Sequence, residues 1–497
     1  MNILIDANTL YQKECGSKTY TYNIIKEFLI IKNSRNSLNS TNNTNDTNNT
    51  NDTNDTNDTN DTKNKSIADI LNIDTDTATD AGNIINIDIC DISGNILSLE
   101  NTEQLNEIMI KSNQKSFLTK LKKSVPQDSF FYPYIKSFYR NIKKNVNRIN
   151  INSAHKKGKV YDIFFTPYQM EIAADIARYK FITIHDIYAL THPENYLTET
   201  YTASFKKYLK DYLKYFNAVL TVSEFTKNEI AEYFNYPENK IFVVRGAFNS
   251  ENYKKIRDAK TIYGRLVSAE TAINTDTAYL NNINNTNSIN NINIIKQFKE
   301  KYGLNKHYIL YVGVIEPRKN IINLLRAYKE LQTCSNIECN VNNASLDMKN
   351  KNFNLDLILV SGSSALAGDI FKLIEELKSN VKVFKNVNNE DLNLFYNCAD
   401  LFIFPSLYEG FGIPPLEAFA CGTPVAASNA TAIPEICGNG AYYFNPRSID
   451  SIKDAVLNIL KSPSLQSELI KNGLEKAEMY SFKNSALELM GIFNKFL

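Results

Sequence analysis

Short runs of apolar residues alternate with stretches of helical periodicity in the first half of the chain. The first run is Ile3-Leu4-Ile5, and apolar residues then recur at helical spacing over 20–30. Further apolar runs, several of them separated by helical stretches, lie at 163–165, 181–184, 219–222 and 241–244. Strands that are joined by helices pair in parallel, so this half predicts a doubly wound sheet.

The same pattern restarts in the second half of the chain. Its apolar runs lie at 308–312, 357–360, 381–384, 401–404 and 424–427. We therefore predict an α/β fold with two Rossmann-like, doubly wound domains that face a cleft. We expect an N-terminal domain over 1–250 and a linker with an insert over 251–300. A C-terminal domain should follow over 301–480, and a last helix over 481–497.

Three tracts rich in asparagine interrupt the pattern. They cover residues 39–65, 258–295 and 333–353, and the first repeats Asn-Asp-Thr almost without a break. Such sequences have few apolar residues to bury, so we expect disordered inserts.

The composition of the chain argues against several classes of function. The formal net charge is +1, which argues against nucleic acid as a partner of the whole protein. No apolar run is long enough to span a membrane, so we expect a cytoplasmic protein. Of the seven cysteines, Cys334 and Cys339 lie close together but have no histidine nearby, so we expect no metal site there.

Residues 115–159 are strongly basic. They contain twelve Lys or Arg and one acidic residue, Asp128, with aromatic residues interleaved. This combination suits peripheral contact with an anionic membrane surface. Nucleic acid would also suit it, and the more ordinary interpretation is a solvated helix face with aromatic residues in the core.

The segment 409–417 is the most informative in the chain. Glu409 and Glu417 lie on either side of Gly410, Phe411 and Gly412, between an apolar strand and the start of a helix that we place at Pro415. A strand, a glycine turn and a helix N-terminus together present backbone N–H groups to a phosphate. The carboxylates can accept hydrogen bonds from hydroxyls, so the segment suits a sugar nucleotide.

Two other strand ends carry candidate residues. Arg318 and Lys319 begin a helix after the strand 308–312, and His185 and Asp186 follow the strand 181–184. Cations are unfavourable at a helix N-terminus, which favours a phosphate partner over a solvated helix start. An isolated histidine is more often structural, but its position at a strand end favours function here.

These segments resemble the retaining glycosyltransferases of family 4, which have the GT-B fold. Segment 409–417 matches their Glu-x7-Glu signature, and segments 311–320, 181–186, 220–227 and 432–435 are also similar. The resemblance implies a sugar-nucleotide donor on the C-terminal domain and an acceptor on the N-terminal one. It also implies that the last helix, 482–497, crosses back onto the N-terminal domain.

The resemblance assigns roles to single residues. Lys319 and Arg318 would bind the diphosphate, Glu417 the ribose hydroxyls and Glu409 the transferred sugar. His185 would support the reaction centre. The resemblance also assigns Gly410, Phe411 and Gly412 to the loop that binds the donor. It assigns Gly16 and Asp186 to the acceptor side.

The expected function is transfer of a hexose to a glycan or lipid-linked acceptor in surface polysaccharide synthesis. Mannose is the favoured sugar, GDP-mannose the leading donor, and no metal ion or other cofactor is expected. Two alternatives are a non-catalytic nucleotide-sugar-binding protein of the same fold and a sugar-nucleotide epimerase. The presence of Glu409, Lys319, Glu417 and His185 together disfavours the first, and the Glu-x7-Glu run disfavours the second.

Overall fold

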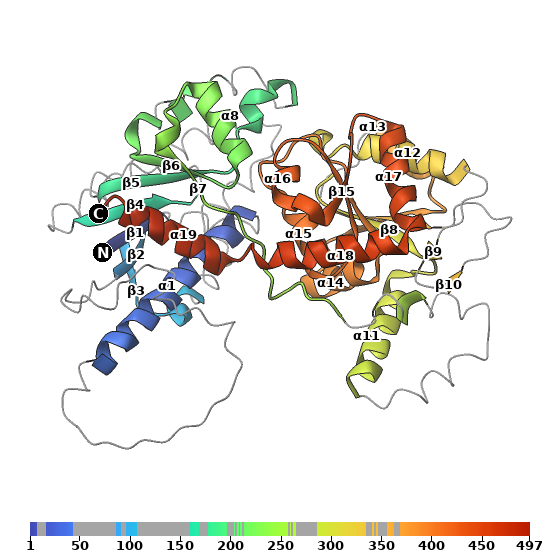
Figure 1. Ribbon diagram of the computed structural model, residues 1–497, viewed down its shortest axis with the longest axis horizontal. Coiled ribbons are helices and arrows are strands. Elements are labelled where there is room, and N and C mark those ends of the chain that lie inside the picture. The colour runs from blue at the N-terminus through green and yellow to red at the C-terminus, as the bar shows by residue number, and fades with distance from the viewer. Residues whose placement is uncertain are drawn as a thin grey trace, which may run out of the picture.

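The computed structural model describes most of two α/β lobes (Figure 1). The described residues are 1–6, 16–42, 86–90, 96–106, 160–167, 177–195, 203, 206–207, 209–210, 213–256, 259, 262–264, 286–333, 340–341, 344–345, 355–361 and 368–497. The basic segment 115–159 lies outside them, as do residues 43–65 of the first asparagine-rich tract.

The N-terminal lobe is built on a seven-stranded sheet in the order β3-β2-β1-β4-β5-β6-β7. All neighbours in it pair in parallel except β2 and β3, which are antiparallel. Its strands are β1 (Asn2–Asp6), β2 (Asn86–Cys90), β3 (Ile96–Leu99), β4 (Tyr161–Thr166), β5 (Ala177–Ile184), β6 (Ala218–Thr221) and β7 (Ile241–Val243).

The strands of this sheet are apolar on both faces, because both faces are covered. Ile3, Ile5 and Phe165 pack into one core, while Leu4 and Phe164 pack into another on the opposite side. The first core is covered by α1 (Gly16–Asn42) and α19 (Phe482–Asn494), and the second by α6 (Tyr188–Thr191) and α8 (Glu224–Phe234). The short turns of this lobe are η2 (Pro193–Asn195) and η3 (Glu238–Lys240).

The C-terminal lobe is built on a six-stranded sheet in the order β12-β11-β8-β13-β14-β15, with every pair parallel. Its strands are β8 (Tyr308–Val312), β11 (Asp356–Ser361), β12 (Val381–Lys385), β13 (Leu401–Phe404), β14 (Val425–Ser428) and β15 (Ala441–Phe444). A separate hairpin joins β9 (Asn340–Val341) and β10 (Ala344–Ser345).

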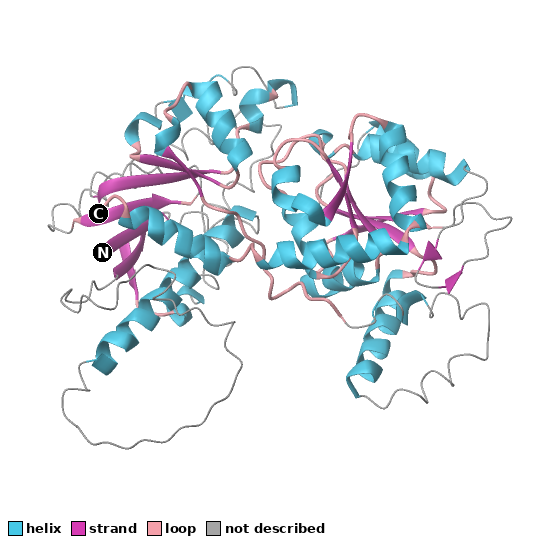
Figure 2. Ribbon diagram, viewed as in Figure 1, coloured by secondary structure: helices cyan, strands magenta, loops and turns pink. Residues whose placement is uncertain are grey.

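Helices cover both faces of this second sheet (Figure 2). One core involves α11 (Thr286–Tyr302), α14 (Asn389–Cys398), α15 (Ile413–Ala420), α16 (Ile433–Cys437) and α18 (Pro463–Glu478). The other involves α12 (Ile321–Thr333), α13 (Gly368–Glu376) and α17 (Ile449–Lys461). The turns η5 (Pro317–Lys319) and η6 (Gly438–Gly440) complete the lobe. The prediction of two doubly wound domains is confirmed.

The last helix, α19, packs on the N-terminal sheet although α18 belongs to the C-terminal lobe (Figure 1). Phe493 contacts Phe181 at a ring-centroid distance of 4.7 Å and Phe165 at 5.7 Å. This is the crossing that the resemblance implies. None of the helices in the described part of the chain is long and apolar enough to cross a membrane.

Parts of the asparagine-rich tracts are regular. Residues 39–42 are the end of α1, and residues 286–295 form the first part of α11. Residues 340–341 and 344–345 of the third tract form β9 and β10, so the prediction of disorder was wrong at all these positions. Ile292 and Ile295 of α11 are buried in the C-terminal core. Burial of apolar side chains in this core accounts for a helix in a sequence whose asparagines favour helices poorly.

Candidate active site

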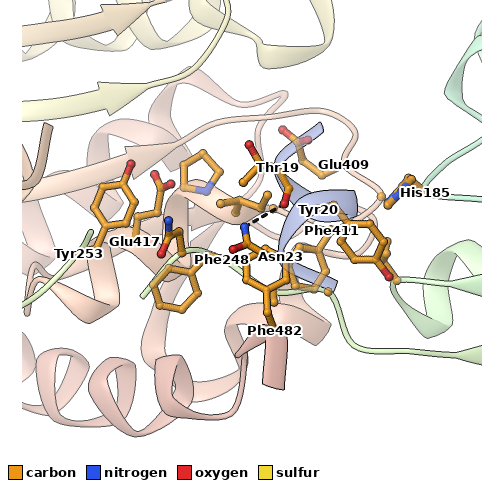
Figure 3. Close-up of a pocket in the computed structure, with 18 of the residues that line it drawn as sticks. Thr19, Tyr20, Asn23, His185, Phe248, Tyr253, Glu409, Phe411, Glu417 and Phe482 are labelled. Carbon is orange, nitrogen blue, oxygen red and sulfur yellow. Dashed lines mark hydrogen bonds between the residues drawn. The ribbon is translucent and has the colours of Figure 1, made fainter. Parts of the chain in front are cut away.

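A cleft of about 850 Å³ separates the lobes and is lined by residues of both. Its walls are the carboxyl ends of strands, the first turns of α1 and the segment that joins the lobes. Of the predicted site residues, those that line it are His185, Asp186, Arg318, Lys319, Glu409, Gly410, Phe411, Gly412 and Glu417. Figure 3 shows Glu417 at one end of this group and His185 at the other.

The two loops with the candidate donor residues start at neighbouring strands. Strand β8 carries η5 at its carboxyl end, and β13 carries the loop with Glu409. The sheet order reverses direction between these strands, because β11 lies on one side of β8 and β13 on the other. Such a switch point leaves an open crevice for a ligand, so the topology itself brings the loops together.

Glu409 joins these loops through two ion pairs. Its Oε1 accepts a hydrogen bond from Lys319 Nζ at 2.5 Å, and its Oε2 accepts one from Arg318 at 3.1 Å. Arg318 also donates from Nε to Glu316 at 2.5 Å. Burial disfavours the charged form of Arg318 and by itself lowers its pKa. The carboxylates of Glu409 and Glu316 have the larger combined effect, so the pKa of Arg318 is raised. The two cations predicted to bind a diphosphate are thus paired with carboxylates.

Asn320 holds these loops in place, a role that the sequence did not reveal. It ends η5 in the left-handed conformation, with φ of 58°. Its side-chain amide donates to the carbonyl oxygens of Pro405 and Pro446, at 3.1 and 2.7 Å. It thereby connects the loops that follow β8, β13 and β15.

At Gly410 the backbone of the C-terminal lobe comes very close to the backbone of the N-terminal lobe. A Cβ atom added there would lie 2.3 Å from the backbone oxygen of His185, so no other residue fits without a shift. Its own carbonyl oxygen accepts a hydrogen bond from Ser223 Oγ at 2.7 Å. The close approach expected of Gly410 is therefore to the other lobe.

Helix α15 begins at Ile413, two residues before the start predicted at Pro415. Gly412 precedes it with φ of 110°, a conformation that side chains other than hydrogen strongly disfavour. The helix N-terminus borders the cleft, since Gly412, Ile413 and Pro414 all line it. Its partial positive charge favours an anionic ligand there.

His185 lies directly after β5 and is half-buried. Its Nε2 is 3.0 Å from the carbonyl oxygen of Pro167, which can only accept, so Nε2 carries the proton. Burial lowers the pKa of the imidazole, although the Pro167 hydrogen bond and the charge of Asp186 oppose the shift. The neutral ring then has Nδ1 as its acceptor nitrogen. Tyr20 of α1 packs edge-on against it at 5.1 Å.

Glu417 projects from α15 at the far end of the cleft (Figure 3). Its Oε2 accepts a hydrogen bond from Tyr396 at 2.7 Å. Burial raises the pKa of Glu417 to about 7, and hydrogen bonds from Tyr396 and Tyr253 oppose this shift. Its proton occupancy therefore changes near neutral pH.

The acceptor side differs from the prediction. Gly16 is the first residue of α1 and not part of a loop, and the residues of α1 that line the cleft are Thr19, Tyr20, Tyr22 and Asn23. Asp186 does line the cleft, and its Oδ1 accepts from the backbone of Tyr188 at 3.1 Å. The helical pattern could have indicated these α1 residues, because Tyr20 lies on its apolar face.

The segment that joins the lobes also contributes side chains that the sequence did not indicate. Phe248 and Tyr253 line the cleft, with Phe482 from the returning helix (Figure 3). No spacing or motif marks them, because they reach the site only through the arrangement of the lobes. Among the described residues, no group of three or more His, Cys, Asp or Glu side chains could hold a metal ion.

Solved structures of other proteins share this architecture. A glycosyltransferase of Rickettsia africae superposes with a TM-score of 0.51 at 16% identity, over 82% of this chain and 89% of that one. Anabaena Alr3699/HepE, solved with UDP and glucose, superposes with a TM-score of 0.55 at 14% identity, over 100% of both chains. The fold is GT-B.

Sequence comparisons point the same way. Residues 294–476 match the family model described as glycosyl transferases group 1. O-antigen chain mannosyltransferase B of Escherichia coli is 27% identical over 333 residues, which cover 66% of this chain and 72% of that protein. O-antigen chain mannosyltransferase RfbU of Salmonella typhimurium is 28% identical over 290 residues, which cover 58% and 63%. These matches support a glycosyltransferase.

A third relative is matched only in part. The serotype-specific mannosyltransferase WbdA of Escherichia coli is 27% identical over 326 residues. Those residues cover 64% of this chain but only 34% of WbdA.

Proposed function

We propose that this chain is a retaining glycosyltransferase that moves a hexose from a sugar nucleotide to a glycan or lipid-linked acceptor in surface polysaccharide synthesis. The observation that carries the proposal is the convergence of Arg318, Lys319, Glu409 and His185 on one cleft between two lobes. These residues come from three strand ends that lie far apart in the sequence. Cations for a diphosphate thereby face a histidine and a carboxylate that can bind a sugar.

In the proposed reaction, the acceptor hydroxyl oxygen bonds to the anomeric carbon while the diphosphate leaves with the bonding electrons. The hydroxyl proton passes to the departing phosphate oxygen. Arg318, Lys319 and the N-terminus of α15 stabilise the growing negative charge. Each hydrogen bond to a charged group contributes about 1.5–3 kcal/mol. Because the protein supplies these groups, we propose that no metal ion is required.

The other residues orient the donor. Glu417 accepts hydrogen bonds from the ribose hydroxyls, and Glu409 turns to hydroxyls of the transferred sugar. The neutral ring of His185 accepts a hydrogen bond at Nδ1 from the sugar beside the reaction centre. Leaving and attacking groups then occupy the same face of the sugar, so its anomeric configuration is retained.

Mannose is the proposed sugar, because several relatives are named as mannosyltransferases. GDP-mannose is the leading donor and UDP-glucose the main competitor, since Alr3699/HepE was solved with UDP-glucose. We also propose that residues 115–159, outside the described part, hold the protein at an anionic membrane surface. Vesicles with anionic lipid should retain the full chain at low salt, and failure to do so would remove that proposal.

Turnover tests the function directly. The full chain is incubated with a panel of labelled sugar nucleotides and extracted lipid-linked acceptor, with and without a chelator. We expect transfer from one donor, undiminished by the chelator, and an anomeric configuration in the product that matches the donor by NMR. Binding of donor without transfer to any acceptor would favour the non-catalytic alternative. Activity lost on chelation and restored by manganese would contradict the absence of a metal requirement.

A further inference from the structure

Glu409 pairs with the two cations that a diphosphate needs. Its two oxygens accept from Lys319 and Arg318, and its side chain is only 8% exposed. Glu316 neutralises the second cation from its other side. These two cations and two carboxylates have no net charge, so an incoming diphosphate meets donors that are already engaged.

We propose that Glu409 is an internal competitor of the nucleoside diphosphate and makes the site select intact sugar nucleotides. This inference rests on the proposed function and concerns the same site. The competition follows from the geometry, because one carboxylate holds both cations through separate oxygens. A diphosphate that contacts Lys319 and Arg318 must displace it.

Once a diphosphate has displaced Glu409 from the two cations, the affinity of the ligand depends on whether it offers Glu409 a new hydrogen-bond partner. A sugar nucleotide brings hydroxyls to which the displaced carboxylate can turn, so both charged groups remain paired. A nucleoside diphosphate has only its ribose hydroxyls, which Glu417 binds, and no hydroxyls of a transferred sugar, so it leaves Glu409 enclosed without a partner. An enclosed, unpaired charge is strongly unfavourable, so Glu409 returns to the cations and the diphosphate leaves. The same carboxylate thus helps to bind the donor and to release the product.

Glu316 provides a matched control. It pairs with Arg318 through Nε, and its side chain is 34% exposed, so it carries the same charge but contacts only one of the two cations. If net charge alone governed diphosphate affinity, Glu316→Gln and Glu409→Gln would strengthen it equally. If competition for both cations governs it, Glu409→Gln would have the larger effect.

Calorimetry on the full chain tests the inference with GDP and UDP as probes. We expect Glu409→Gln to bind the preferred diphosphate about tenfold more tightly than wild type, since one charged competitor is removed. Glu316→Gln should change this affinity by less than about threefold. The intact sugar nucleotide should gain nothing from Glu409→Gln. Glu409→Asp, which is too short to reach both cations, serves if the glutamine variant does not fold, and should also bind the diphosphate more tightly.

The outcomes separate the inference from the proposed function. Equal or weaker diphosphate binding by Glu409→Gln, or an equal gain by Glu316→Gln, overturns the inference and leaves the proposed function intact. If neither wild type nor any variant binds a diphosphate or a sugar nucleotide, both are overturned. Product inhibition gives a second measure, since the diphosphate should inhibit any residual transfer by Glu409→Gln at lower concentration than in wild type.

Discussion

Lys319 is the more enclosed of the two cations in the donor loop, with 11% of its side chain exposed against 22% for Arg318. We expect Lys319→Met to weaken nucleoside diphosphate binding at least tenfold, because about 1.5–3 kcal/mol of charged hydrogen bonding is lost. Calorimetry with GDP and UDP measures it. Lys329→Met is the control, since Lys329 is exposed and paired with Glu376 on the surface. Equal affinity in Lys319→Met and wild type would place the diphosphate elsewhere.

Glu417 should make the stability of the protein depend on pH. Burial raises its pKa in the folded protein from 4.5 to about 7. Between these values the unfolded chain has released the proton and the folded protein still holds it. The free energy of unfolding therefore falls as pH rises through this window. The stability that protonated Glu417 contributes is lost above about pH 7.

Urea unfolding of wild type and Glu417→Gln between about pH 5 and pH 8 measures this effect. Glutamine does not titrate, so wild type should lose stability relative to the variant as pH rises. Glu232→Gln is the control, because Glu232 is exposed on α8. A constant difference between wild type and Glu417→Gln across the range would show that Glu417 has the same pKa in both states.

At the scale of elements, helix α8 links the lobes through its N-terminus. Ser223 caps it by accepting from Thr226 N at 3.1 Å, as its position after a strand predicts. Glu435 of α16, in the other lobe, accepts from the backbone N–H groups of Glu224 and Phe225 at 2.8 and 3.0 Å. A carboxylate at a helix N-terminus is favourable, so this contact stabilises the packing of the two lobes against each other.

We expect Glu435→Ala to open the cleft, because these two N–H groups lose their carboxylate. Small-angle scattering should show a larger radius of gyration than in wild type. A fluorophore pair with one dye on each lobe should report a longer distance. Glu232→Ala, at the other end of α8, should leave both measurements unchanged. An unaltered scattering profile for Glu435→Ala would mean that other contacts alone hold the lobes.

The elements that the sequence missed are those stabilised by contacts distant in the chain. Strands β2 and β3 follow a long polar tract, and their short alternating runs gain stability only at the edge beside β1. Helix α11 begins among asparagines and becomes regular by burying Ile292, Ile295 and Phe298. In contrast, β8 and β13 were predictable, because strands buried on both faces are continuously apolar.

At the scale of the whole molecule, the site also combines features that a local sequence pattern marks with features that arise only when distant segments meet. Residues at strand ends could be predicted, since parallel strands bring their carboxyl ends to one edge. The ion pairs of Glu409 and the contact of Gly410 with His185 could not be predicted from the sequence. They depend on side-chain rotamers and on how the lobes meet, and no local pattern encodes either. The residues of α1 that line the cleft differ, because the helical pattern marks the face on which Tyr20 lies and could have indicated them.

The chain crosses between the lobes a second time before α19, and this helix completes the N-terminal core with residues from the end of the sequence. Phe493 packs on Phe28, Phe165 and Phe181, at centroid distances of 6.2, 5.7 and 4.7 Å. It is fully buried, so Phe493→Ala removes a large side chain from a closed core. We expect a loss of about 3–5 kcal/mol in the stability of the N-terminal lobe.

Hydrogen exchange with mass spectrometry can resolve where that loss falls. Peptides from β1, β4 and β5 should exchange faster in Phe493→Ala, while peptides from β8 and β13 keep their protection, because α19 packs on the first sheet only. Phe371→Ala is the control, since Phe371 is 50% exposed on α13. Equal loss of protection in both lobes would mean that they unfold as one unit. The returning helix would then stabilise the whole molecule, and cleft opening by Glu435→Ala should also lower protection in both sheets.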